Sequence, residues 1–140
     1  MKFTAAVVDT NVVVSGLLST DAAAPTARIL DGMRRGVFPF LISHALLREY
    51  RGVLLRDRVW KRHGRSERDV DALLTEIVTH AIVREPHARN GAPDPKDQHV
   101  WSLVQTQANA VLVTGDQALA TKPPPGWRVV SPREFADQLA

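Results

Sequence analysis

The chain has 140 residues, of which 44% are apolar and 24% are charged, and its formal net charge is +3. This length fits one globular domain, residues 1–140, that is large enough to bury a hydrophobic core. The sequence contains no cysteine, which excludes disulfides, thiolate metal ligands and thiol nucleophiles and fits a reducing cytoplasm. No apolar stretch is long enough to span a bilayer and no signal peptide is evident, so we expect a cytoplasmic protein without membrane contact.

Short apolar runs alternate with helical periodicities along the chain. The first half is predicted to contain a strand over 3–8, helices over 11–18 and 25–35, a strand over 37–42 and an amphipathic helix that Ser43 caps. The second half is predicted to contain a helix from Ser66, a strand over 81–83, a helix over 95–109, a strand over 110–113, a helical turn over 116–120, a strand over 128–130 and a short helix that the capping box 131–134 opens. This alternation indicates an α/β fold, in which a small, mainly parallel sheet of about five strands lies between helices.

Two aspartates lie just beyond predicted buried strands. Asp9 ends the first apolar run, and Asp116 follows the run 110–113 after Thr114 and Gly115. In open α/β sheets, ligands bind beyond the carboxyl ends of the strands, so both carboxylates are candidates for one site. The structural alternative is that each aspartate only caps the helix that follows it.

Two further acids lie on predicted helices. At 100° per residue, Asp97 falls inside the apolar arc of its helix, where an ionised acid is costly unless it has a partner or a metal. Glu49 lies about 100° from the centre of its apolar stripe, on the border between core and solvent. The alternatives are that Asp97 is an acid of the first helical turn after an Asp94 cap, and that Glu49 pairs with Arg56. Asp94 is also a candidate secondary ligand.

The four acids Asp9, Glu49, Asp97 and Asp116 would repel one another if the fold brings them together. Such repulsion raises the pKa values of carboxyl groups unless a cation neutralises them. Clusters of carboxylate oxygens suit hard cations, so we expect Mg²⁺ or Mn²⁺. Metal-assisted hydrolysis of a phosphodiester is the chemistry that this arrangement favours.

Basic residues are concentrated between positions 48 and 68. Arg58, Lys61 and Arg62 are candidates for binding a phosphate backbone, because a local excess of cations can follow a line of phosphates. The alternative is an ordinary solvated helical face.

The motifs that carry the acids also resemble a known family. They read Val8-Asp9-Thr10-Asn11, Leu47-Arg48-Glu49, Asp94-Pro95-Lys96-Asp97 and Val113-Thr114-Gly115-Asp116. In this order and over nearly the whole chain, they resemble the PIN domain, and most of all the VapC-like toxins of bacterial toxin–antitoxin pairs. The resemblance implies a Mg²⁺- or Mn²⁺-dependent ribonuclease with a small parallel sheet between helices.

The resemblance also assigns roles to individual residues and implies partners. Asp9, Glu49, Asp97 and Asp116 match the acidic quartet of the family, and Thr10, Asn11 and Thr114 match polar residues that support the site. Relatives often follow the third acid with a second one, whereas this chain has Gln98 and His99. The implied partners are RNA, a cognate antitoxin and a second copy of the chain in a homodimer.

Two other functions remain open at this point. A phosphatase of the haloacid-dehalogenase type also places an aspartate at the end of its first strand, but it needs a second aspartate where this chain has Asn11. A PIN-like module that binds a partner without catalysis is the other alternative. Among the remaining polar residues, His99 lies about 160° around the helix from Asp97, so we expect it to face solvent. The three tryptophans are interpreted as packing residues rather than as a platform for stacked bases.

Overall fold

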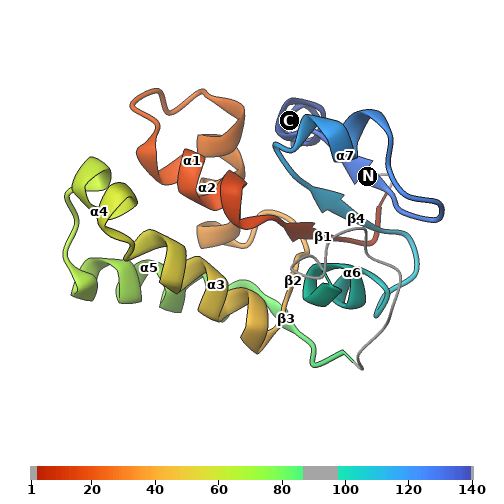
Figure 1. Ribbon diagram of the computed structural model, residues 1–140, viewed down its shortest axis with the longest axis horizontal. Coiled ribbons are helices and arrows are strands. Elements are labelled where there is room, and N and C mark those ends of the chain that lie inside the picture. Colours follow the sequence, from red (N-terminus) through yellow and green to blue (C-terminus); the bar gives the residue numbers. More distant parts are fainter. Residues whose placement is uncertain (1–2, 87–97, 140) are drawn as a thin grey trace.

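The computed structural model describes residues 3–86 and 98–139 of the chain (Figure 1). Its strands are β1 (Ala5–Val8), β2 (Leu41–Ile42), β3 (Ile82–Val83), β4 (Ala110–Val113) and β5 (Val129–Val130). All the pairings are parallel: β4 lies between β1 and β5, and β2 pairs with β3. A single parallel bridge between Ala6 and Phe40 joins the two groups of strands. The prediction of a small, mainly parallel α/β sheet is therefore confirmed.

The described helices occupy nearly all of the predicted positions. They are α1 (Thr10–Leu18), α2 (Pro25–Arg35), α3 (His44–Leu54), α4 (Asp57–His63), α5 (Glu67–His80), α6 (Gln98–Val104), α7 (Gln117–Thr121) and α8 (Pro132–Asp137). In Figure 1, α6 lies below the strands β1 and β4, whereas α1 and α2 lie above them. None of the helices in the described ranges has the length and apolarity that a membrane crossing requires.

Serine side chains start three of these helices as the sequence predicts. Ser43 accepts a hydrogen bond from the backbone N–H of Leu46, and Ser131 accepts one from Glu134. Ser66 and Asp69 form a reciprocal capping box at the start of α5. Each bond satisfies a backbone donor that has no partner within its helix.

Two predicted elements are clearly shorter than expected, and one observed helix is not predicted. Residues 37–40 do not extend β2, because Gly36 ends α2 with a left-handed φ of 69° and Pro39 has no N–H to donate. The predicted helix 95–109 ends at Val104, where the hydroxyl and backbone N–H of Thr106 both bond to the carbonyl oxygen of Leu103. The segment 95–97 lies outside the described residues. Helix α4 occupies a segment for which the sequence predicts no element.

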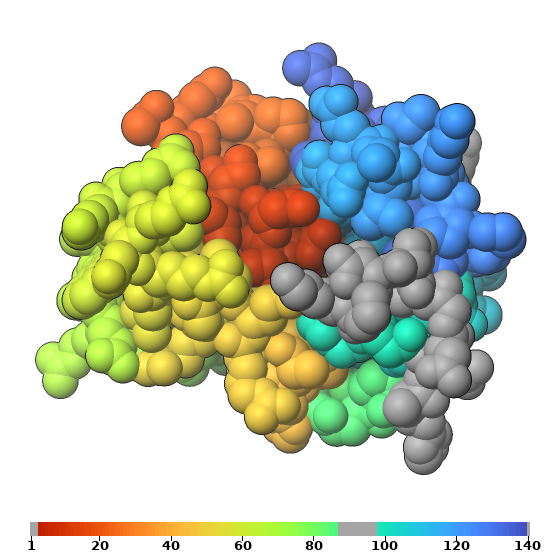
Figure 2. Space-filling model, viewed as in Figure 1, coloured from red at the N-terminus to blue at the C-terminus, as the bar shows by residue number. Residues whose placement is uncertain are grey.

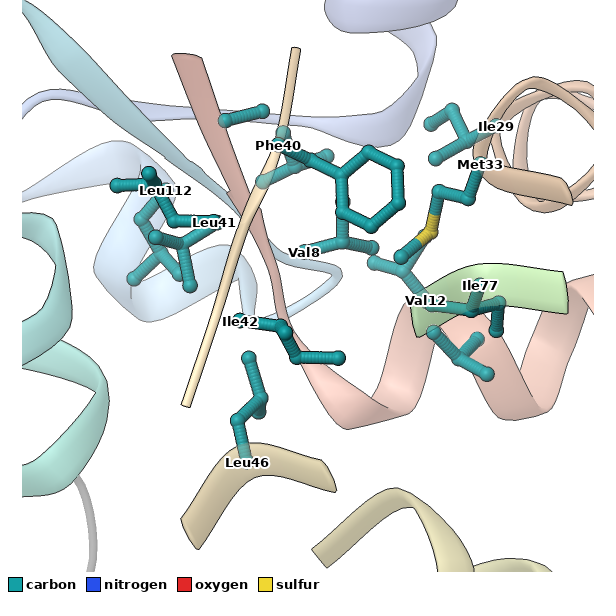
Figure 3. Packing of buried hydrophobic residues seen from close by; sticks show 14 of the residues in the cluster. Val8, Val12, Ile29, Met33, Phe40, Leu41, Ile42, Leu46, Ile77 and Leu112 are labelled. Atoms are coloured by element: carbon teal, nitrogen blue, oxygen red, sulfur yellow. The ribbon is translucent and has the colours of Figure 1, made fainter. Parts of the chain in front are cut away.

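The core explains the continuous apolar runs of the sequence. All residues of β1 and β4 are buried, as expected for central strands of a parallel sheet that is covered on both faces. Phe40 packs beside this sheet, in the same core as Leu112 of β4, and Met33 of α2 and Ile77 of α5 close the core on one side (Figure 3). The strands β1 and β4 are parallel, with Val8 opposite Val113. The segments that follow these two strands therefore leave the sheet at the same edge.

Candidate active site

Asp9 follows β1 at this edge of the sheet and is held by three neighbours. Its Oδ1 accepts a hydrogen bond of 2.8 Å from the backbone N–H of Thr10, so Asp9 caps α1. Its Oδ2 accepts bonds of 2.8 Å from the hydroxyl of Thr114 and 3.4 Å from the amide of Asn11. Asp9 can therefore cap α1 and also take part in a site, because the capping bond uses only one of its two carboxylate oxygens.

Asp116 lies at the same edge, after β4. Its Oδ1 accepts hydrogen bonds from the backbone N–H groups of Ala118 and Leu119, at 3.0 and 3.3 Å, so this aspartate also caps its helix. Its own backbone N–H donates to the hydroxyl of Thr114, over 3.1 Å. Thr114 therefore contacts both aspartates, through Oδ2 of Asp9 and the backbone of Asp116.

Asn11 completes a polar network between the two strand ends. Its Oδ1 accepts a hydrogen bond of 3.1 Å from the backbone N–H of Gly115, and its Nδ2 donates to the hydroxyl of Thr114 over 3.3 Å. These bonds tie the start of α1 to the segment after β4. The structure thus brings together Asn11, Thr114 and both strand-end acids.

Glu49 reaches the same site from helix α3. The hydroxyl of Tyr50, its neighbour in the chain, donates to the carbonyl oxygen of Val8, which fixes this turn of α3 beside the end of β1. Oε2 of Glu49 accepts a hydrogen bond from the hydroxyl of Thr10. The side chain is 34% exposed, in agreement with its predicted position on the border between core and solvent.

Burial and the two neighbouring acids both act on the carboxyl group of Asp9. Burial raises the pKa of Asp9 above its ordinary value, and the negative charges of Glu49 and Asp116 raise it further. The hydrogen bonds from Thr114 and from the backbone of Thr10 act in the opposite direction. A nearby positive charge would therefore favour the ionised form of Asp9, which burial and the two acids disfavour.

His99 also belongs to this cluster, and the expectation that it faces solvent is wrong. Its Nε2 lies 3.1 Å from Oε1 of Glu49, and its side chain is only 27% exposed. The prediction measured the angle around one helix and could not include the neighbouring helix α3, which contacts α6 on this side. A contact between two helices leaves no signal in the periodicity of either one, so the helical pattern does not single out His99.

Two of the predicted site residues, Asp94 and Asp97, lie outside the described residues. The structure therefore places three members of the predicted quartet, Asp9, Glu49 and Asp116. Within residues 3–86 and 98–139, no set of three acidic, histidine or cysteine side chains is arranged so that it could already hold a metal ion.

A cleft of about 710 Å³ opens beside the acids. Its lining includes Asp9 and Asn11 at one end, the apolar side chains of Val14 and Val53 along its walls, and Arg62 of α4. It lies where α1, drawn in red, adjoins the yellow α3 and α4 (Figure 2). Of the three predicted phosphate-binding residues, Arg62 lines this cleft, and Arg58 and Arg62 line an adjoining hollow of about 420 Å³. Lys61 lines neither of them.

Comparison with known proteins identifies the fold family. A sequence profile described as the PIN domain matches residues 5–118, a range that includes β1, α3, β4 and all four predicted acids. The chain belongs to the PIN-domain family. A search of curated proteins found no match to the chain. PIN domains are typically nucleases and generally use divalent metals, so the family favours a nuclease over the phosphatase alternative.

The residues of this PIN domain fit a divalent cation of the magnesium type. Asp9, Glu49 and Asp116 supply carboxylate oxygens, and the hydroxyls and amide around them can support ligands or bound water. Hard cations such as Mg²⁺ and Mn²⁺ prefer such an oxygen-rich set. A bound cation would also favour the ionised form of Asp9, whose pKa burial raises.

Proposed function

We propose that this PIN domain is a Mg²⁺- or Mn²⁺-dependent endoribonuclease and the toxin of a toxin–antitoxin pair, working as one domain over residues 1–140 in the cytoplasm. The observation that carries the catalytic part is that Glu49 and Asp116 lie close enough to Asp9 to act on it electrostatically, and that Asp9 lines a cleft that Arg62 also lines. We propose that these acids and Asp97 hold the metal, with Asp94 as a candidate secondary ligand. The proposal that RNA is the substrate rests on the resemblance to VapC-like toxins.

The side chains of the site have two proposed roles: some bind the metal, and others hold these ligands in place. Asp9, Glu49, Asp97 and Asp116 would hold a divalent cation, and this cation would supply water activation and stabilisation of the leaving oxygen in phosphodiester hydrolysis. Asp9 and Asp116 offer carboxylate oxygens from two strand ends whose spacing the β1–β4 register fixes. Asn11 and Thr114 hold these acids in place through direct hydrogen bonds, and Thr10 holds Glu49. Such supporting bonds keep ligands in a productive geometry without binding the metal themselves.

A cleavage assay tests this function directly. Purified protein should cut single-stranded RNA in the presence of Mn²⁺, and an excess of EDTA should stop the reaction, because the acids alone repel the phosphate backbone. A DNA strand of the same sequence, assayed in parallel, reports whether the 2′-hydroxyl is required. If RNA is cut at the same rate with and without EDTA, the metal-dependent mechanism is wrong.

The position of Arg62 supports a role in binding the RNA backbone. The side chain lines the cleft that contains Asp9, and helix α4 is held there by His63, whose ring bonds to the carbonyl oxygen of Leu54 and to the backbone N–H of Arg65. A phosphate beside the scissile bond would meet this guanidinium after entering the cleft. Arginine is well suited to the role, since it binds phosphate through two parallel N–H groups.

Replacing Arg58, Lys61 and Arg62 together with alanine should weaken RNA binding and reduce its dependence on salt. The log–log slope of affinity against salt should fall by roughly one for each phosphate contact that is lost. Because the three side chains are not proposed ligands, Mn²⁺ binding should be unchanged. Filter binding or fluorescence anisotropy over a range of salt concentrations measures the effect.

Single variants distinguish the three positions. Arg62→Ala should carry most of the loss, whereas Lys61→Ala, which removes the neighbouring charge of the same helix but lies outside the cleft lining, should change the slope little. An unchanged slope in the triple variant would make this segment an ordinary solvated surface.

We also propose that the protein forms a homodimer and binds a small antitoxin through the helices around residues 28–35 and 46–54. Two surface hollows support this choice. One, of about 400 Å³, includes Arg28, Arg35 and the half-exposed Val37. The other, of about 430 Å³, lies between α3 and α5 and includes the apolar side chains of Leu47 and Val78. Exposed apolar side chains next to charged ones are typical of surfaces that bind other proteins.

A further inference from the structure

We infer that His99 is a positioning residue, whose imidazole holds Glu49 in the orientation in which this glutamate binds the metal. The inference rests on the proposed metal-dependent function and adds a residue to it that neither the sequence pattern nor the family match assigns. It is carried by the direct contact between Nε2 of His99 and Oε1 of Glu49, over 3.1 Å, across the interface of α3 and α6.

The carboxylate of Glu49 is held from two sides. Oε2 accepts a hydrogen bond from the hydroxyl of Thr10 on α1, and Oε1 faces the imidazole of His99 on α6. A glutamate side chain has several rotatable bonds, and two fixed contacts restrict them before any metal arrives. Each carboxylate oxygen can accept more than one bond, so both oxygens keep a lone pair with which they can bind a cation.

The contact with Glu49 uses one of the two ring nitrogens of His99. A carboxylate oxygen is the acceptor in this contact, so Nε2 is the donor. The other ring nitrogen, Nδ1, is buried without a hydrogen-bond partner among the residues that the structure describes. A buried polar atom without a partner destabilises a fold, so an apolar side chain would serve packing better at this position. The contact with Glu49 is therefore the feature that the imidazole provides.

A second histidine–glutamate pair offers a matched control. Nδ1 of His44 lies 2.9 Å from Oε1 of Glu85, and these side chains are 74% and 57% exposed, compared with 27% and 34% for His99 and Glu49. Solvent weakens the exposed pair, and neither of its members is a proposed metal ligand. His44→Leu therefore removes the same type of contact without touching the site.

The test is calorimetric titration of Mn²⁺ into metal-free protein, together with the Tm of the metal-free state. In His99→Leu the dissociation constant for Mn²⁺ should rise by about tenfold or more, as for other residues that orient a metal ligand. The Tm without metal should stay the same or increase, because the variant removes a buried polar atom that has no described partner. His99→Gln should remain within about threefold of the parent affinity, because its amide carries an N–H at a similar reach from the backbone.

The outcomes separate the inference from the function on which it rests. Parent affinity for Mn²⁺ in His99→Leu would overturn the positioning role and leave the metal site intact. A lower Tm in metal-free His99→Leu, with no rescue of metal binding in His99→Gln, would also overturn it and make His99 a packing residue. His44→Leu should bind Mn²⁺ like the parent, and a loss equal to that of His99→Leu would count against a specific role. If the parent protein does not bind Mn²⁺, the proposed metal-dependent function is wrong, and so is this inference.

Discussion

Replacing Asp9 with asparagine should abolish the stabilisation of this protein by Mn²⁺ while leaving its fold intact. A ligand that binds only the folded state stabilises it by mass action, by about 2.7 kcal/mol at a hundred times its dissociation constant. For a domain of this size, such an increase corresponds to a rise in Tm of roughly 8 °C. Asparagine caps helices as well as aspartate does, so the start of α1 should survive the change. Scanning calorimetry with and without Mn²⁺ measures the shift.

The same substitution should increase the stability of the metal-free protein at neutral pH. The pKa of Asp9 is raised in the folded state, mainly by burial, so the folded protein favours the protonated carboxyl. The stabilising contribution of that proton is present at acid pH and is lost as the pH rises through the raised pKa. The Tm advantage of Asp9→Asn should therefore grow as the pH increases across this interval and disappear at acid pH, where both side chains are neutral.

Asp137→Asn provides a control for the loss of one carboxylate. Asp137 is an exposed residue at the end of α8, and it is not a proposed ligand. This variant should keep the full Mn²⁺ shift. An equal response to Mn²⁺ in the parent and in Asp9→Asn would show that Asp9 is not a metal ligand.

Expression of the chain alone should slow the growth of a bacterial host, and Asp116→Asn should restore growth. The expected effect is large, because a free ribonuclease removes the RNA on which growth depends, and the loss of one ligand disables the metal site. Asparagine retains an oxygen that can accept the capping bonds from Ala118 and Leu119, so α7 should still form. Growth curves after induction, with immunoblots to match protein levels, provide the measurement.

The growth experiment also distinguishes catalysis from partner binding. Equal growth arrest by the parent and by Asp116→Asn at equal protein levels would indicate toxicity through binding rather than through cleavage. Asp137→Asn should be as harmful as the parent, because it leaves the proposed site unchanged. Relief by both substitutions would point to a general loss of expression or folding.

The central part of the fold follows closely from sequence pattern. Residues 110–113 and 25–35 are observed at the predicted boundaries, because a continuous apolar run and a helix that ends at a glycine are both strong local signals. The parallel pairing of β1 with β4 confirms the parallel sheet that the alternation of strands and helices predicts. Helix α4 has no buried residue and therefore no apolar stripe for a pattern to detect.

The site could be predicted only in part. Asp9 and Asp116 follow from strand ends, since parallel strands leave a sheet at one edge, and Glu49 follows from its position beside an apolar stripe. The contact of His99 with Glu49 depends on how α3 and α6 pack, and it joins residues 50 positions apart. The roles proposed for these residues stay predictions until variants are measured.

The rate of RNA cleavage by Asp9→Asn, relative to the parent at saturating Mn²⁺, tests the central claim most directly. If Asp9, Glu49 and Asp116 form one metal-dependent site, this rate should fall by at least about a hundredfold, as for other groups that stabilise charge in a transition state. Glu49→Gln, which reaches the site from a different helix, should show a loss of similar size. Rates within a few-fold of the parent in both variants would contradict the account, because the acids would then lie beside the cleft without taking part in the reaction.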